Sequence, residues 1–127
     1  MNFPPIVSLL QSAGVGVPGT SLFTNEMPSE CRNGILLLDS YGGTPIDHYL
    51  PGYKRCEFRV TTRAIEQVAG MTFAKKVSDV LTVHQPKTLP GMILKLSLPQ
   101  NEPRPYRRSV GGYWEFEVEV DVTYVDA

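Results

Sequence analysis

The chain has 127 residues, which suits one domain, residues 1–127, with one hydrophobic core. Apolar residues make up 42% and charged residues 20%, as in ordinary globular proteins, and a net charge of −1 excludes strong overall attraction to nucleic acid or membranes. No apolar run approaches the roughly 18 residues that cross a bilayer, and the start lacks a secretory signal, so cytosolic synthesis is expected. Cys31 and Cys56 are therefore expected to be reduced and buried.

The first third of the chain predicts a short helix and two strands. Pro4 and Pro5 suit a first helical turn, apolar residues follow at helical spacing, and Gly14 ends the helix. A short strand is expected over residues 21–24. The continuous apolar run 35–39 is typical of a strand covered on both faces, near the middle of a sheet.

A loop rich in tyrosine follows over residues 40–53. Gly and Pro punctuate it, and it contains Tyr41, Tyr49 and Tyr53. A structured loop of this kind is often a contact surface. The alternative is a compact loop whose tyrosines pack on their own domain. The sequence leaves both interpretations open.

Residues 55–62 alternate in polarity, which predicts a strand. Cys56, Phe58 and Val60 share its inward side, and Arg55 and Arg59 lie on the other. The main helix is expected over residues 64–83, with Thr62 as its N-cap. Its predicted apolar stripe comprises Ile65, Ala69, Phe73, Val77, Val80 and Leu81. Gly70 interrupts this helix and is expected to allow close approach to the sheet.

The segment after the helix contains a turn, a strand and a basic loop. The turn is expected over residues 84–91 and the strand over residues 92–98. Residues 99–111 hold three prolines, which argue against regular structure, and form a loop containing Arg104, Tyr106, Arg107 and Arg108. Such a loop is either a solvated tip or a contact for phosphate or an acidic protein surface.

The stretch 112–125 alternates strictly for most of its length and predicts a long strand, around which the other elements are expected to pack. Its apolar side runs from Trp114 to Val122. Its other side, expected to be solvated, carries Glu115, Glu117, Glu119 and Asp121. Either basic residues of a neighbouring strand, such as Arg55 and Arg59, neutralise this row, or it forms an acidic surface for a partner or channel.

Together these elements predict an α+β fold. The expected sheet is mixed and mainly antiparallel, with one long and one short helix packed on one face. His48, His84, Asp47 and the two cysteines show no zinc-ligand spacing, and no P-loop or Gly-x-Ser-x-Gly motif occurs. No catalytic residue, metal or cofactor is therefore expected.

One block of sequence resembles a known family. Leu22-Phe23, Pro28, the run from Ile35 through Gly42-Gly43 to Tyr49-Leu50-Pro51, and Phe58 to Arg63 are similar to tail terminator or minor capsid proteins of long-tailed bacteriophages. The resemblance implies a structural subunit of the virion, made in the host cytoplasm. It implies a ring, of about six copies, that caps the finished tail tube and offers a surface to the head connector. DNA passes through its bore, and neither enzymatic activity nor a membrane partner is implied.

Two other classes remain open on the sequence alone. One is a small-ligand or peptide-binding α+β domain, with the tyrosine-rich loop 41–53 as the lip of its pocket. The other is a small hydrolase with an unrecognised site. A ring in electron micrographs would distinguish the resemblance from both.

Overall fold

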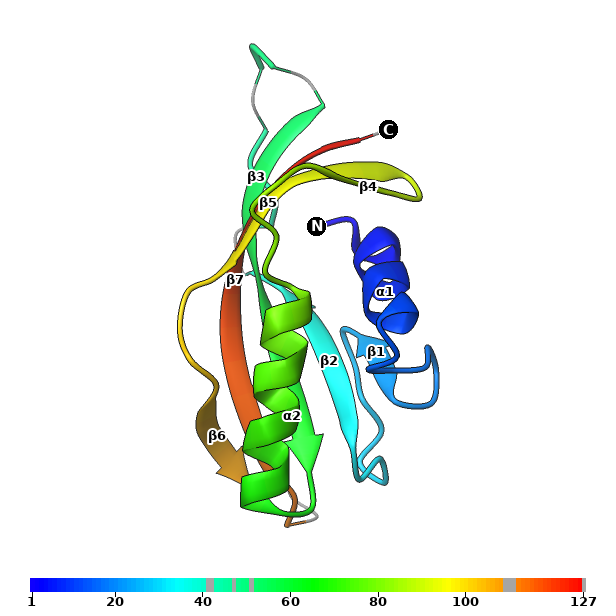
Figure 1. Ribbon diagram of the computed structural model, residues 1–127, viewed down its shortest axis with the longest axis vertical. Helices are drawn as coiled ribbons and strands as arrows, with labels where there is room; N and C mark the ends of the chain where they lie inside the picture. The colour runs from blue at the N-terminus through cyan, green and yellow to red at the C-terminus, as the bar shows by residue number, and fades with distance from the viewer. Residues whose placement is uncertain (41–42, 47, 51, 109–111, 127) are drawn as a thin grey trace.

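A computed structural model describes residues 1–127 except 41–42, 47, 51, 109–111 and 127 (Figure 1). Two helices and seven strands occur among the described residues. Their order is α1 (Phe3–Ser12), β1 (Leu22–Thr24), β2 (Gly34–Asp39), β3 (Tyr53–Ala64), α2 (Gln67–Val80), β4 (Lys87–Leu89), β5 (Met92–Pro99), β6 (Arg104–Arg108) and β7 (Trp114–Asp126).

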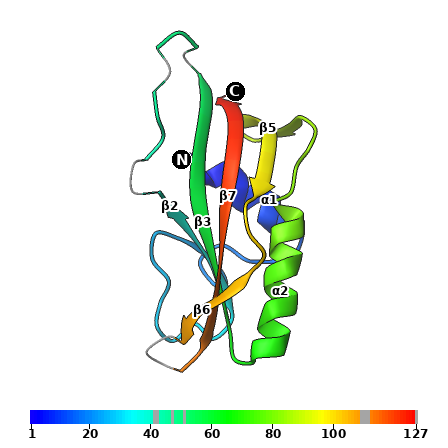
Figure 2. The same ribbon diagram turned by 90° about the vertical axis from the view of Figure 1, so that its left-hand side faces the viewer.

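The sheet is built around β7, the strand predicted from strict alternation. The strand order is β1-β2-β3-β7-β5-β4, and β6 also pairs with β7. β3 accompanies β7 from the Tyr53↔Val125 pair to the Ala64↔Trp114 pair, and the two run side by side along the molecule (Figure 2). On its other edge, β7 pairs first with β6 and then with β5. Among the pairs of described strands only β1 and β2 are parallel, so the expected mixed, mainly antiparallel sheet is confirmed.

Both helices cover the same face of the sheet (Figure 2), as expected for the α+β class. The core between them contains apolar side chains of α1 and α2 and of the inward sides of β2, β3, β5 and β7. The rings of Phe3 and Phe58 meet edge to face with centroids 5.8 Å apart, which joins α1 to the middle of the sheet. α1 ends as predicted: Gly14 follows its C-cap with a φ of 74°.

The main helix differs from the prediction at its start. β3 continues to Ala64, so α2 begins at Gln67 with Glu66 as N-cap and no side-chain capping bond; the expected Thr62 cap is wrong. Ladder pairing with β7 and burial outweigh the helical tendency of this segment. The buried face of α2 is Gly70, Ala74 and Val77, whereas Ile65 and Ala69 are exposed. The predicted stripe is therefore rotated, because it included two residues that do not face the sheet.

Three further expectations are corrected. β2 lies next to the short edge strand β1, not at the middle of the sheet, and only alternate residues such as Ile35 and Leu37 are fully buried. The expected turn 84–91 includes the short strand β4. The segment 99–111 was expected to lack regular structure, yet it contains β6. A proline is tolerated there because β6 is an edge strand with a register shift between Pro105 and Arg107.

Candidate functional site

The face of the sheet that the helices leave open carries the acidic row, and its first member is buried. Glu115 is 7% exposed, and its Oε2 accepts bonds from Nε and Nη2 of Arg63 at 3.3 and 3.2 Å. Arg63 also donates from Nη1 to the carbonyl oxygens of Pro28 (2.8 Å) and Cys31 (3.1 Å). The segment 28–31 therefore covers this end of the face. The expectation that Glu115 is solvated is wrong, because a segment distant in sequence closes over it.

Glu117, the second member, is also buried rather than solvated, at 6% exposure. Arg104 of β6 reaches it with Nη2 at 3.9 Å from Oε1. The side chain of Asn101 donates to the Glu117 carbonyl at 3.1 Å and accepts from the Glu119 amide at 2.9 Å. Arg104 thus lies in a strand against β7 and not on a solvated tip. β6 and Asn101 together close the polar face at Glu117.

The remaining two carboxylates stay accessible. Glu119 is exposed and lies opposite Arg59 in the β3–β7 register. Asp121 accepts a 3.4 Å bond from Nη2 of Arg55, whose side chain is 72% exposed. Exposed ion pairs contribute only about 0–1 kcal/mol to folding. The acidic row therefore divides into a buried half, paired with Arg63 and Arg104, and an accessible half, in which Asp121 is paired with Arg55.

The tyrosine-rich loop extends beyond the sheet at one end of the long axis (Figure 1). Tyr49 is 94% and Tyr53 41% exposed, so neither is buried against its own domain. Two apolar neighbours that the sequence analysis did not single out, Ile46 and Leu50, are 79% and 55% exposed. Tyr41 lies outside the described residues. The structure therefore places a group of large, partly apolar side chains on a projecting loop.

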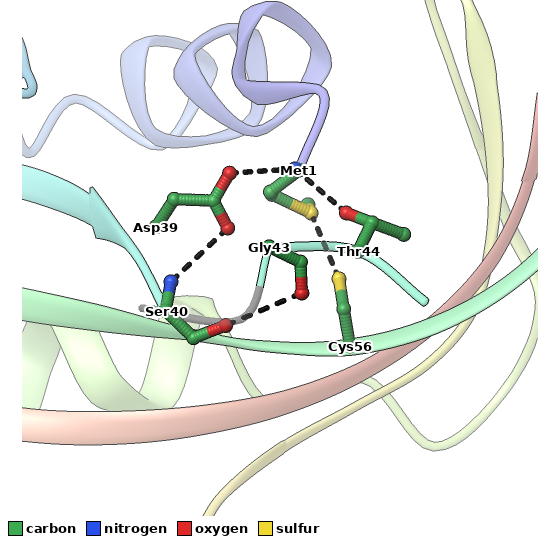
Figure 3. A network of polar contacts seen from close by, with 6 residues as sticks. All are labelled: Met1, Asp39, Ser40, Gly43, Thr44 and Cys56. Carbon is green, nitrogen blue, oxygen red and sulfur yellow. Dashed lines mark hydrogen bonds and ion pairs between the residues drawn. The ribbon is translucent and has the colours of Figure 1, made fainter. Parts of the chain in front are cut away.

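The base of this loop is held by a polar network around Met1 (Figure 3). The α-ammonium group of Met1 donates to Asp39 Oδ2 and to Thr44 Oγ1, both at 2.8 Å. Asp39 Oδ1 accepts a bond from the Ser40 amide at 3.1 Å. Ser40 Oγ in turn donates to the carbonyl of Gly43 at 3.3 Å. These bonds connect the start of the loop to β2 and to the segment before α1.

The two cysteines differ in their surroundings. Cys56 is 5% exposed beside the Met1 sulfur, and burial raises the pKa of its thiol. Cys31 was expected to be buried, but it is only half-buried, with Sγ 3.3 Å from the carbonyl of Asn33. The expectation for Cys31 is wrong because segment 28–31 is a surface segment.

We expect iodoacetamide at pH 8 to modify Cys31 and leave Cys56 intact in the folded protein, because the thiolate reacts and Cys56 is buried with a raised pKa. Mass spectrometry of the intact and digested protein measures this directly. Urea-unfolded protein is the control and should take up two labels. Equal modification of both thiols under native conditions would show that the Cys56 site opens readily.

Each of the two histidines lines a surface cavity. The larger, about 570 Å³, lies between the end of α2 and residues 98–103, and the smaller, about 290 Å³, adjoins the tyrosine-rich loop. His84 lines the first and His48 the second, so the two histidines are not brought together. Among the described residues, no group of three His, Cys, Asp or Glu side chains is placed to hold a metal ion. The histidines therefore lie in separate cavities and do not form a joint site.

A comparison with protein families decides the class of this chain. A family model described as "Bacteriophage tail terminator protein" matches residues 9–126. The chain belongs to this tail terminator family. The resemblance found in the sequence is thereby confirmed, and the match extends from α1 through β7. No curated protein matches the chain.

Membership of the tail terminator family sets the general role. The protein is a structural component of a bacteriophage tail, and its place is the virion, where it associates with other tail components. The family is structural, not enzymatic. Neither α1 nor α2, the helices in the described part of the chain, is long and apolar enough to cross a membrane.

Proposed function

We propose that this tail terminator closes the end of a completed tail tube as a ring of six copies. Its presence there ends tube polymerisation and offers a surface to the head connector. The family match over residues 9–126 carries the proposal. The projecting apolar loop supports it, because closed rings are built from repeated contacts and exposed apolar groups mark such contacts.

The basic strand β6 is the proposed contact with an adjoining ring, either the tube or the connector. Arg104, Tyr106, Arg107 and Arg108 all belong to it, and arginine and tyrosine are enriched in protein interfaces. Among the described strands β6 pairs only with β7, so its other edge is available to a partner. The backbone positions of these residues support the proposal; the side chains of the last three lie outside the described part.

The accessible half of the acidic row is the proposed wall of the bore. Glu119 is exposed on the face that the helices do not cover, and Glu57 is exposed on the neighbouring strand. Carboxylates repel DNA phosphates, so DNA would slide past them without binding. Glu115 and Glu117 are not part of this proposal, because each is buried against an arginine.

The alternative role, binding of a small ligand or peptide at the tyrosine-rich loop, has one supporting observation. The cavity of about 290 Å³ beside Tyr53 is lined by Thr44, Ile46 and His48. Ligand sites usually occupy about 300–1,000 Å³, so this cavity is at the lower limit. A metabolite that co-purifies with the protein would favour this role.

Electron microscopy of purified tails tests the ring. We expect tails from a mutant that lacks this gene to carry tubes of variable, excessive length, and complementation with the wild-type chain to restore uniform tubes that end in a ring. Tubes assembled without the gene for another head-tail joining protein are the matched control and should still end in a ring. A single asymmetric copy at the tube end would overturn the proposal.

A further inference from the structure

Six of the seven large apolar side chains that the described chain exposes form two groups at opposite ends of the molecule, and the seventh, Val17, lies apart from both. The first, here called the loop group, comprises Ile46, Tyr49, Leu50 and Tyr53; the second, the helix-start group, comprises Ile65 and Val68. β3 connects them, with the loop before its first residue and α2 after its last (Figure 1). Its twelve residues separate the groups by about 40 Å.

The helix-start group is exposed for a physical reason. Because β3 continues to Ala64, Ile65 falls in the connection before α2, and Val68 lies on the side of the helix away from its buried residues Gly70, Ala74 and Val77. Val68 is 81% and Ile65 50% exposed as a result. Contiguous apolar side chains on a surface are a recognised feature of protein contact sites.

The two groups are large enough to form part of one protein interface. A fully exposed aromatic side chain offers about 200 Å², so Tyr49 and Tyr53, at 94% and 41% exposure, provide roughly 270 Å², and four aliphatic side chains add to this area. A standard-size interface buries about 1,600 Å² over both partners, of which about 900 Å² is apolar. The two groups, one from each copy, therefore supply a substantial part of the apolar area of one such interface.

We infer that the loop group of one copy packs against the helix-start group of the next copy. An unrelated partner at one end would leave the other apolar group in water, whereas a second copy of the same chain covers both by repetition. A contact between different patches of identical chains closes into a ring when the rotation permits. The inference deepens the proposed ring and rests on it for closure, but the contact itself is tested without tails.

The experiment uses two complementary variants of the full chain. The loop variant carries Ile46→Ser and Tyr49→Ser, and the helix-start variant carries Ile65→Ser and Val68→Ser. The control is Val17→Ser, because Val17 is 55% exposed but belongs to neither group. Sedimentation and native mass spectrometry up to millimolar concentration measure association, and circular dichroism with thermal melting checks folding. If a double variant melts early, Tyr49→Ser alone or Val68→Ser alone replaces it.

We expect the wild type and the Val17 control to associate as concentration rises, and each variant alone to remain monomeric. An equimolar mixture of the two variants should give a 1:1 dimer and nothing larger, because one intact loop group and one intact helix-start group remain. A mixture that stays monomeric, or a wild type that stays monomeric at millimolar concentration, would overturn the contact. Rings on tails together with a monomeric mixture would refute the contact and leave the ring standing. A 1:1 dimer together with tails that carry no ring would support the contact and refute the proposed ring.

Discussion

Replacing Arg63 by Met is expected to lower the free energy of unfolding by about 3–5 kcal/mol, the usual cost of removing one partner of a buried ion pair. Glu115, which is 7% exposed in the folded protein, would lose its guanidinium partner. The carbonyl groups of Pro28 and Cys31 would lose their donor as well. Met fills much of the volume of the arginine stem, so the loss reports mainly on charge and hydrogen bonding. Urea unfolding followed by circular dichroism gives the value.

Two companion variants make this result specific. Arg55→Met removes an arginine from an accessible pair, with Asp121, and should cost only about 0–1 kcal/mol. Arg63→Met combined with Glu115→Leu removes both buried charges and should recover part of the loss. If Arg63→Met costs no more than Arg55→Met, segment 28–31 does not close the polar face in solution.

Replacing Gly70 by Val is expected to cost about 3 kcal/mol, at the upper end of the usual range for overpacking a core. A Cβ atom at this position would lie 2.5 Å from Cε2 of Phe116 and 2.9 Å from Cβ of Ala64. Phe116 is fully buried, so its ring has no open space into which to move. Gly70→Ala should cost less, because the gain in helix propensity of about 1 kcal/mol offsets part of the overlap.

The neighbouring residue supplies the control for Gly70. Ala69 is exposed on the same helix, so Ala69→Val should change stability by only a few tenths of a kcal/mol. Thermal melting of the four variants, with Gly70→Ala and Ala69→Gly included, separates packing from propensity. A Gly70→Ala protein more stable than the wild type would mean that α2 can shift away from β7.

The Arg63 and Gly70 sites stabilise the part of the fold that positions the proposed contact surfaces. Gly70 sets the distance between α2 and the long strands, and Arg63 fixes segment 28–31 over the end of β7. The helix-start group lies directly beside both, at residues 65–68. A variant that loosens either site is therefore expected to weaken assembly as well as folding, whereas substitutions in the exposed loop group act on assembly alone.

Local sequence patterns determined most elements of this protein. The period-two alternation predicted both long strands, since each side chain of a strand is assigned to a face by its immediate neighbours. The spacing of Ile6, Leu9 and Leu10 and the position of Gly14 predicted α1. The order of these elements was sufficient for the α+β class. The residues between Leu22 and Arg63 were sufficient for the resemblance that the family match confirmed.

Only the tertiary structure decided which of the polar residues are covered. Alternation assigned Glu115, Glu117, Glu119 and Asp121 to one face, but it carries no information on what lies above that face. Segment 28–31 buries the first carboxylate and β6 the second, and both arrive from elsewhere in the chain. Arg63 lies on the same side of β3 as Arg55 and Arg59, and this position was the one sequence feature that pointed to its buried ion pair with Glu115.

The same reason explains the misplaced ends of the elements. From local sequence alone, residues 62–64 could form the cap and first turn of the helix. Pairing with β7 instead keeps them in β3, so α2 begins only at Gln67. Residues 104–108 contain proline and have weak strand character alone, yet β7 offers them an unpaired edge. A residue's neighbours in sequence determine its local conformational preference. Strand pairing and burial against distant segments contribute more to the free energy of folding than this preference does. In this tail terminator the distant segments therefore decided where each element ends and which charges remain in contact with water.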